Sequence, residues 1–148
     1  MEFVENKGQW NSRVDYRGDF NTGSFFIEKN GFTVLLHDPE DVQALSEIAH
    51  GHKADKESLS KPIVFNSFAY KVNFLGANLQ SLSVPDKPLP TYNNYFLGND
   101  PAAWAGGCRV FQAVTYRDVY PNIDIRYYSN AGKLKYDFIV RPGGNVAS

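Results

Sequence analysis

The chain has 148 residues, of which 43% are hydrophobic, and a formal net charge of −1. A chain of this length forms one domain and can bury enough surface for a core without metal or disulfide support. Its single cysteine excludes an intrachain disulfide, and its near-neutral charge argues against a nucleic-acid binder. No apolar run approaches the ~20 residues of a helical membrane span. We therefore expect one domain over residues 1–148, without nucleic acid or a membrane span among its partners.

Most of the chain alternates apolar and polar residues with the period of two that is typical of half-buried β-strands. Clean alternation predicts strands at 68–74, 123–127 and 134–140, and weaker patterns predict strands at 14–20, 24–29, 32–37, 92–97 and 110–116. The Asn30-Gly31 pair between two apolar runs is a strong hairpin signal. The pattern predicts an all-β fold, a sandwich of mainly antiparallel strands.

The last two strands carry enough charge to predict their register. One pairing places like charges opposite each other at two positions, whereas a shift of two residues places Arg126 opposite Asp137. Opposite charges across a ladder are favoured by a few tenths of a kcal/mol, and like charges are disfavoured similarly. We therefore predict that Tyr127 lies opposite Tyr136, with the turn at residues 131–132.

An acidic segment that begins at Asp38 interrupts the strand pattern. Asp38 can cap a helix, and Pro39 fits the first helical position, where its missing N–H costs nothing. Glu40 and Asp41 then complement the helix dipole in the first turn. These signals predict one peripheral helix at residues 39–49.

The 11 Phe, 9 Tyr and 2 Trp are the most suggestive residues for binding. Exposed Tyr and Trp side chains can stack on sugar rings or hold a protein partner. Tyr128 shares the polar face of its strand and is the first candidate; Trp10 and Trp104 are the others. Asp100 and Pro101 predict a helical turn from which Trp104 projects onto the sheet. The alternative interpretation is that most aromatics pack in the core, as their inward phase favours.

Residues with catalytic or metal-binding chemistry form no specific motif. His50 and His52 are weak metal candidates, because their spacing matches no helical zinc motif and solvated loop histidines are the favoured interpretation. Asp124 and Asp137 are expected as outward charges on strands, not as a glycosidase pair. Cys108 has no histidine motif nearby, and no serine lies in a G-x-S-x-G context. We expect no metal, no cofactor and no enzymatic activity.

Four segments in order carry a family resemblance: residues 3–10, residues 94–101 with Trp104, residues 114–124, and residues 134–140 with Pro142-Gly143. Together they resemble the uncharacterised N-terminal domain of large secreted bacterial surface proteins. In that family the domain precedes seven-bladed β-propeller (SBBP) repeats, PKD-like domains or a gliding-motility-associated C-terminal region. The resemblance implies export and a role at the cell surface, with neighbouring domains of the same polypeptide as partners.

The resemblance favours a non-catalytic structural or adhesion module of an exported cell-surface protein. A signal peptide is expected to have been removed before Met1, and residues 1–148 are expected to be either a whole domain or the first lobe of a longer unit. The second hypothesis is a carbohydrate-binding domain that holds an extracellular glycan with exposed aromatics. A hydrolase is the third and least favoured, since it would require convergent carboxylates or histidines.

Overall fold

The computed structural model describes residues 1–49, 64–96 and 98–146. Within these residues, nine antiparallel strands form one sheet, accompanied by one α-helix and one 3-10 turn. In chain order the elements are β1 (Phe3–Glu5), β2 (Val14–Phe20), β3 (Gly23–Glu28), β4 (Gly31–His37), α1 (Pro39–Ala49), β5 (Ser67–Asn73), β6 (Leu82–Tyr95), η2 (Pro101–Ala103), β7 (Ala105–Tyr120), β8 (Ile123–Asn130) and β9 (Lys133–Val140).

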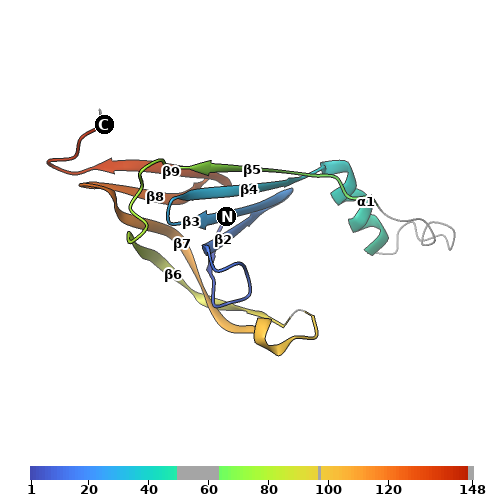
Figure 1. The fold of residues 1–148 in the computed structure, drawn as a ribbon. Helices are drawn as coiled ribbons and strands as arrows, with labels where there is room; N and C mark the ends of the chain where they lie inside the picture. Colours follow the sequence, from blue (N-terminus) through green and yellow to red (C-terminus); the bar gives the residue numbers. More distant parts are fainter. Residues whose placement is uncertain (50–63, 97, 147–148) are drawn as a thin grey trace.

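The sheet divides at β7. One edge of β7 pairs with β6 along its length, while the other edge pairs with β1 at Val110 and Phe111 and then with β8 from Ala113 onward. Two arms therefore leave the same edge: β1 to β5 in one, β8 and β9 in the other (Figure 1). The arms curl toward each other, so the two facing layers belong to a single curled sheet. The predicted all-β class is confirmed.

Aromatic side chains fill the space between the arms. Phe25 and Phe32 of the first arm contact Tyr127 of the second, with ring centroids 5.9 and 6.3 Å apart. Phe25, Tyr116 and Tyr127 are almost completely buried. Burial of each such side chain contributes about 1.5–3 kcal/mol of hydrophobic free energy. Aromatic side chains therefore form the centre of the core, although fewer than half of the aromatic residues are buried.

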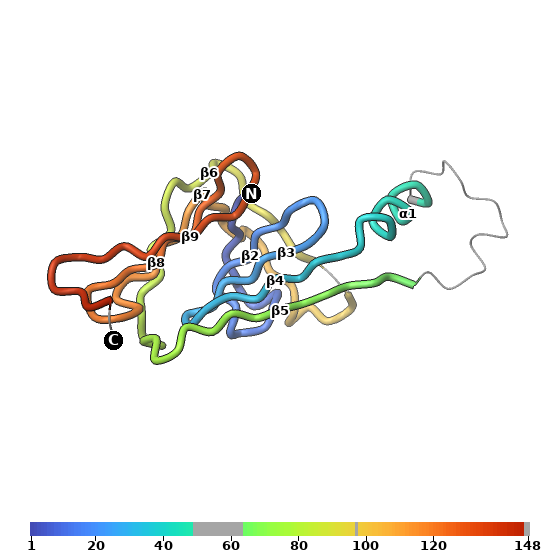
Figure 2. The backbone as a smooth tube through the Cα atoms, turned by 90° about the horizontal axis from the view of Figure 1, so that it is seen from above, coloured from blue at the N-terminus to red at the C-terminus, as the bar shows by residue number. Residues whose placement is uncertain are grey.

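The helix has the bounds predicted from its capping signals. The Asp38 carboxylate accepts a hydrogen bond from the Glu40 backbone N–H at 2.8 Å, and the Asp38 carbonyl accepts the first helical bond from Val42 at 3.0 Å. Asp41 also accepts from the backbone N–H of Asn66 at 2.7 Å, which joins α1 to the chain before β5. The helix lies beyond the ends of β4 and β5, away from the core (Figure 2).

Both hairpin predictions are confirmed. Arg126 lies opposite Asp137 and Tyr127 opposite Tyr136, and the turn at residues 131–132 has positive φ at both positions. The hairpin predicted at Asn30-Gly31 also forms, with Lys29 and Asn30 as its turn and Gly31 as the first residue of β4. Gly31 has a φ of +149°, and a Cβ there would lie only 1.9 Å from the carbonyl oxygen of Val72. Only glycine fits there.

Three strands differ from the sequence prediction. β7 extends beyond its predicted range 110–116 at both ends, the three-residue β1 was not predicted, and β6 begins at Leu82 although it contains Pro85 and Pro88. Prolines are tolerated because β6 pairs only with β7 and is an edge strand. Phe68 and Tyr70 of β5, which the alternation places on the same face as Val72, are 64% and 44% exposed.

Candidate functional site

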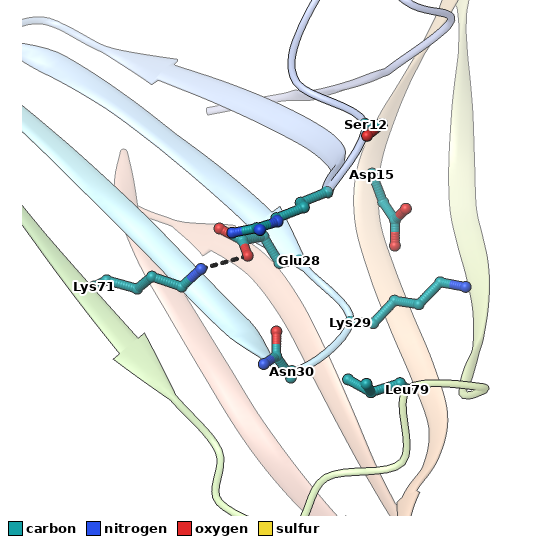
Figure 3. A pocket seen from close by; sticks show the side chains of 8 residues that line it. Ser12, Asp15, Glu28, Lys29, Asn30, Lys71 and Leu79 are labelled. Atoms are coloured by element: carbon teal, nitrogen blue, oxygen red, sulfur yellow. Dashed lines mark hydrogen bonds and ion pairs between the residues drawn. The ribbon is translucent and has the colours of Figure 1, made fainter.

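A pocket lined mainly by polar and charged residues opens on the outer side of the first arm, where β2 begins and the β3–β4 hairpin turns (Figure 3). It has a volume of ≈ 410 Å³ and is lined by Ser12, Arg13, Asp15, Glu28, Lys29, Asn30, Lys71 and Leu79. A second pocket of ≈ 390 Å³ shares three of these residues and adds Trp10, Asn11, Val14, Phe26 and Thr33. We call the two pockets together the outer groove.

A glycine interrupts the row of side chains on the outer face at the groove. Phe26, Thr33 and Lys71 lie side by side on β3, β4 and β5, whereas the next row places Glu28 beside Gly31. Gly31 has no side chain, so β4 places none beside Glu28 in this row.

Glu28 is held in the groove by two donors. Its side chain is only 9% exposed; its carboxylate binds the Lys71 ammonium at 2.6 Å and accepts from the Thr33 hydroxyl at 3.2 Å. A buried carboxylate without such partners would be strongly destabilising. Figure 3 shows the ion pair crossing β4 on one side of the pocket.

Asp15 is the second carboxylate of the groove. It occupies the irregular position between Val14 and Tyr16 in the β2–β3 ladder, and it accepts a hydrogen bond from the Tyr116 hydroxyl at 2.9 Å. Burial, followed by the Asp15 charge, raises the pKa of Tyr116 well above its ordinary value. Tyr116 therefore remains a donor, and both carboxylates have internal partners.

Arg13 and Lys29 provide positive charge without an ion-pair partner among the described residues. Both side chains are exposed. The groove thus carries three cationic residues against two carboxylates, in a chain whose net charge is −1. This arrangement offers charged hydrogen-bonding groups beside aromatic rings, which is a composition typical of binding pockets.

Trp10 lies at one end of the groove, where it also has a structural role. Its ring contacts Tyr95 edge-on at 5.2 Å, and the Arg17 guanidinium lies 5.5 Å from its centre. The Asn6 side-chain amide fixes the loop that carries Trp10 by donating to the carbonyls of Asn11 at 3.0 Å and Val14 at 2.7 Å. The half-buried Trp10 is therefore a wall of the groove, not a free platform.

The other predicted binding residues lie elsewhere. Tyr128 is half-buried on the outer side of β8, and its hydrogen bond with Asp137, followed by partial burial, raises its pKa. Trp104 follows η2 and is 44% exposed; its ring contacts Phe96 at 5.8 Å. The three candidates form no common surface. His50 and His52 lie outside the described residues.

Other residues with possible chemistry are also used by the fold. Asp124 is buried, accepts from the Asp118 backbone N–H at 2.9 Å and pairs with Arg141 at 3.2 Å, so its expected outward position is wrong. Cys108 is buried, and burial raises the pKa of its thiol. Within residues 1–49, 64–96 and 98–146, no group of three potential metal ligands occurs.

Sequence reasoning predicted Trp10 but missed the charged residues that line the groove. Glu28 follows the apolar run Phe25-Phe26-Ile27, and this was the one local signal that a charged side chain enters a buried setting. Its partner Lys71 is 43 residues away in sequence, and no spacing rule connects the two.

The fold and site together define an antiparallel β-domain with a peripheral helix and an open, charged groove on one arm of its sheet. Across the described part of the chain, no helix is long and apolar enough for a membrane crossing. The chain belongs to the family described as Domain of unknown function (DUF7948), whose model matches residues 3–148. Comparisons with curated proteins and with solved structures gave no match.

Proposed function

We propose that the chain is a non-catalytic module of an exported cell-surface protein, with a structural or adhesion role. The observation that carries this proposal is that polar residues of its characteristic segments are held by internal partners in the fold. Asn6 fixes its own loop, Asp15 holds Tyr116, and Asp124 pairs with Arg141. Side chains used in this way specify a fold, whereas catalytic groups converge on a cavity with capacity left for a substrate.

The free edges of the sheet support packing against neighbouring domains of the same polypeptide. β5 and β9 each pair with only one strand, and both expose apolar side chains. These side chains are Phe68, Tyr70, Tyr136, Phe138, Ile139 and Val140. Exposed apolar strand edges are usually covered in a native assembly, because they otherwise promote aggregation. A module that organises a multidomain protein would present such edges.

Surface labelling combined with deletion tests this proposal. An antibody raised against the purified chain should label intact cells that produce the protein, and labelling only after permeabilisation would contradict export. Deletion of residues 3–146 from the coding sequence should reduce either the amount of the protein at the surface or the adhesion of the cells. The first result indicates a structural role and the second an adhesion role; a deletion that changes neither contradicts the proposal.

Carbohydrate binding is the second candidate, and the outer groove is the observation that favours it. The groove combines Arg13, Lys29 and Asn30 with the rings of Trp10 and Phe26. A hydrolase is less favoured, because Asp15 and Glu28 are each held by an internal donor. A glycosidase would need one carboxyl group poised to release its proton and a second free to attack or to activate water.

A further inference from the structure

We propose that the outer groove binds an acidic saccharide, a sugar unit that carries a carboxylate or sulfate group. Arg13 and Lys29 would hold the anionic group, and Ser12 and Asn30 would bind neighbouring hydroxyls. The inference gives the proposed adhesion role a ligand, and in that respect rests on it. The binding site itself follows from the residues that line the groove.

The charge distribution selects an anionic ligand. Lys71 is committed to Glu28 at 2.6 Å, and the Asp15 carboxylate already accepts from Tyr116 at 2.9 Å. The charges of Arg13 and Lys29 have no such partner among the described residues. An anion that enters the groove gains charge-assisted hydrogen bonds, which are about twice as strong as neutral ones.

The polar groups around these cations select a ligand rich in hydroxyls. Ser12 and Asp15 lie on one side of the pocket, with Asn30 and Leu79 opposite (Figure 3). A hydroxyl can donate to a carboxylate and accept from an amide or ammonium at the same time.

The second pocket adds aromatic walls to the polar groups of the first. Trp10 and Phe26 line it, whereas Arg17, which lies 5.5 and 5.4 Å from the centres of their rings, does not. Aromatic side chains provide large contact areas for ring-shaped ligands. The volumes of ≈ 410 and ≈ 390 Å³ lie within the usual range of small-ligand pockets, so the groove accommodates adjoining sugar units.

The backbone under the groove argues against a peptide ligand. β3 and β4 are interior strands whose backbone groups pair on both sides, with β2 and β4 for β3 and with β3 and β5 for β4. An extended peptide binds a sheet mainly through a free strand edge, and the floor of this groove offers none.

Binding of the purified chain to defined oligosaccharides tests the site. Calorimetry should detect binding of at least one member of a panel comprising oligogalacturonate, oligomannuronate, oligoglucuronate and a sulfated galactan. The methyl-esterified form of the bound uronate, which has the same sugars without the charge, should bind at least about tenfold more weakly. For a sulfated ligand, the desulfated polymer is the comparison.

Two charge-matched variants separate the site from a general charge effect. The double variant Arg13→Gln/Lys29→Gln should lose at least about tenfold in affinity with an unchanged thermal midpoint. The control Lys133→Gln/Lys135→Gln makes the same charge change on β9 and should bind as the parent does. Equal losses in both variants would overturn the assignment.

The remaining outcomes also decide the proposal. No binding to any member of the panel overturns it, as does equal or tighter binding of polyglutamate, which would indicate an acidic peptide ligand. Displacement of the saccharide by equimolar inorganic sulfate or phosphate would reduce the site to a simple anion site. These failures leave the surface-labelling experiment unaffected, so failure of the site and failure of the proposed function are distinguishable.

Discussion

The Glu28 carboxylate on β3 and the Lys71 ammonium on β5 form an ion pair at 2.6 Å that crosses β4 beside Gly31. The pair joins two strands that are not neighbours in the sheet. It fixes both the edge strand β5 and the floor of the outer groove, so the same contact links stability to the candidate site.

Removal of the Lys71 ammonium should reveal the free-energy cost of burying the Glu28 carboxylate. We expect Lys71→Met to lower the free energy of unfolding by about 2 kcal/mol, because a carboxylate that is 9% exposed keeps only the Thr33 hydroxyl as a partner. Urea denaturation measures the loss. The double variant Glu28→Gln/Lys71→Met should recover at least half of it, and a double variant as unstable as Lys71→Met alone would contradict this explanation.

Gly31→Ala should be far more destabilising than Gly132→Ala. Both glycines have positive φ, of +149° and +74°, but a Cβ at Gly31 would lie 1.9 Å from the Val72 carbonyl oxygen, while no atom lies within 4 Å of one at Gly132. We expect a cost of about 1 kcal/mol at Gly132 and at least about 3 kcal/mol, or failure to fold, at Gly31. Similar thermal midpoints for the two variants would be incompatible with the structure of the hairpin.

Asn6 should control the environment of Trp10. Asn6→Ala removes the donors to the carbonyls of Asn11 and Val14, and we expect a loss of about 2 kcal/mol together with a red shift of Trp10 emission. A Trp104→Phe background leaves Trp10 as the sole tryptophan. Asn11→Ala, which removes a single acceptor for the Arg13 backbone N–H, serves as the control and should leave the emission unchanged.

Alkaline pH should unfold the domain through its buried tyrosines. Burial raises the pKa of Tyr127 above its ordinary value of 10.0, and burial also raises that of Tyr116. Because the pKa of these tyrosines is raised in the folded state, their contribution to stability is fully present below pH ~10 and is lost as the pH rises further. The unfolded state releases its protons first. Tyr127→Phe should therefore show a shallower loss of stability above pH ~10 than the parent. If the free energy of unfolding, measured by urea denaturation, fell equally steeply with pH in the variant and the parent, a role for Tyr127 in alkaline unfolding would be refuted.

Local signals predicted the parts of the fold that depend on neighbouring residues. Asp38-Pro39 predicted the start of α1, Asn30-Gly31 predicted the β3–β4 turn, and the charges of Arg126 and Asp137 predicted the β8–β9 register. Each of these depends on residues that are close in sequence, or on a turn that brings them together.

Pairings between strands that are distant in sequence could not be predicted from the sequence. β1 is only three residues long and gains its place from β2 and from β7, whose Phe111 lies opposite Phe3. The prolines of β6 conceal a strand that is acceptable only at an edge. The groove also depends on such long-range pairings, because Asp15, Glu28 and Lys71 come together only when β2, β3 and β5 are assembled.

The most direct test of the acidic-saccharide site is an amide chemical-shift titration of the isotopically labelled chain with the uronate or sulfated oligosaccharide that it binds. The account predicts that the largest shifts occur at residues 12–15, at residues 28–31 and at Lys71, and that they vanish in Arg13→Gln/Lys29→Gln. Largest shifts around Tyr128 or Trp104, or along β9, would contradict the assignment of the outer groove as the binding site.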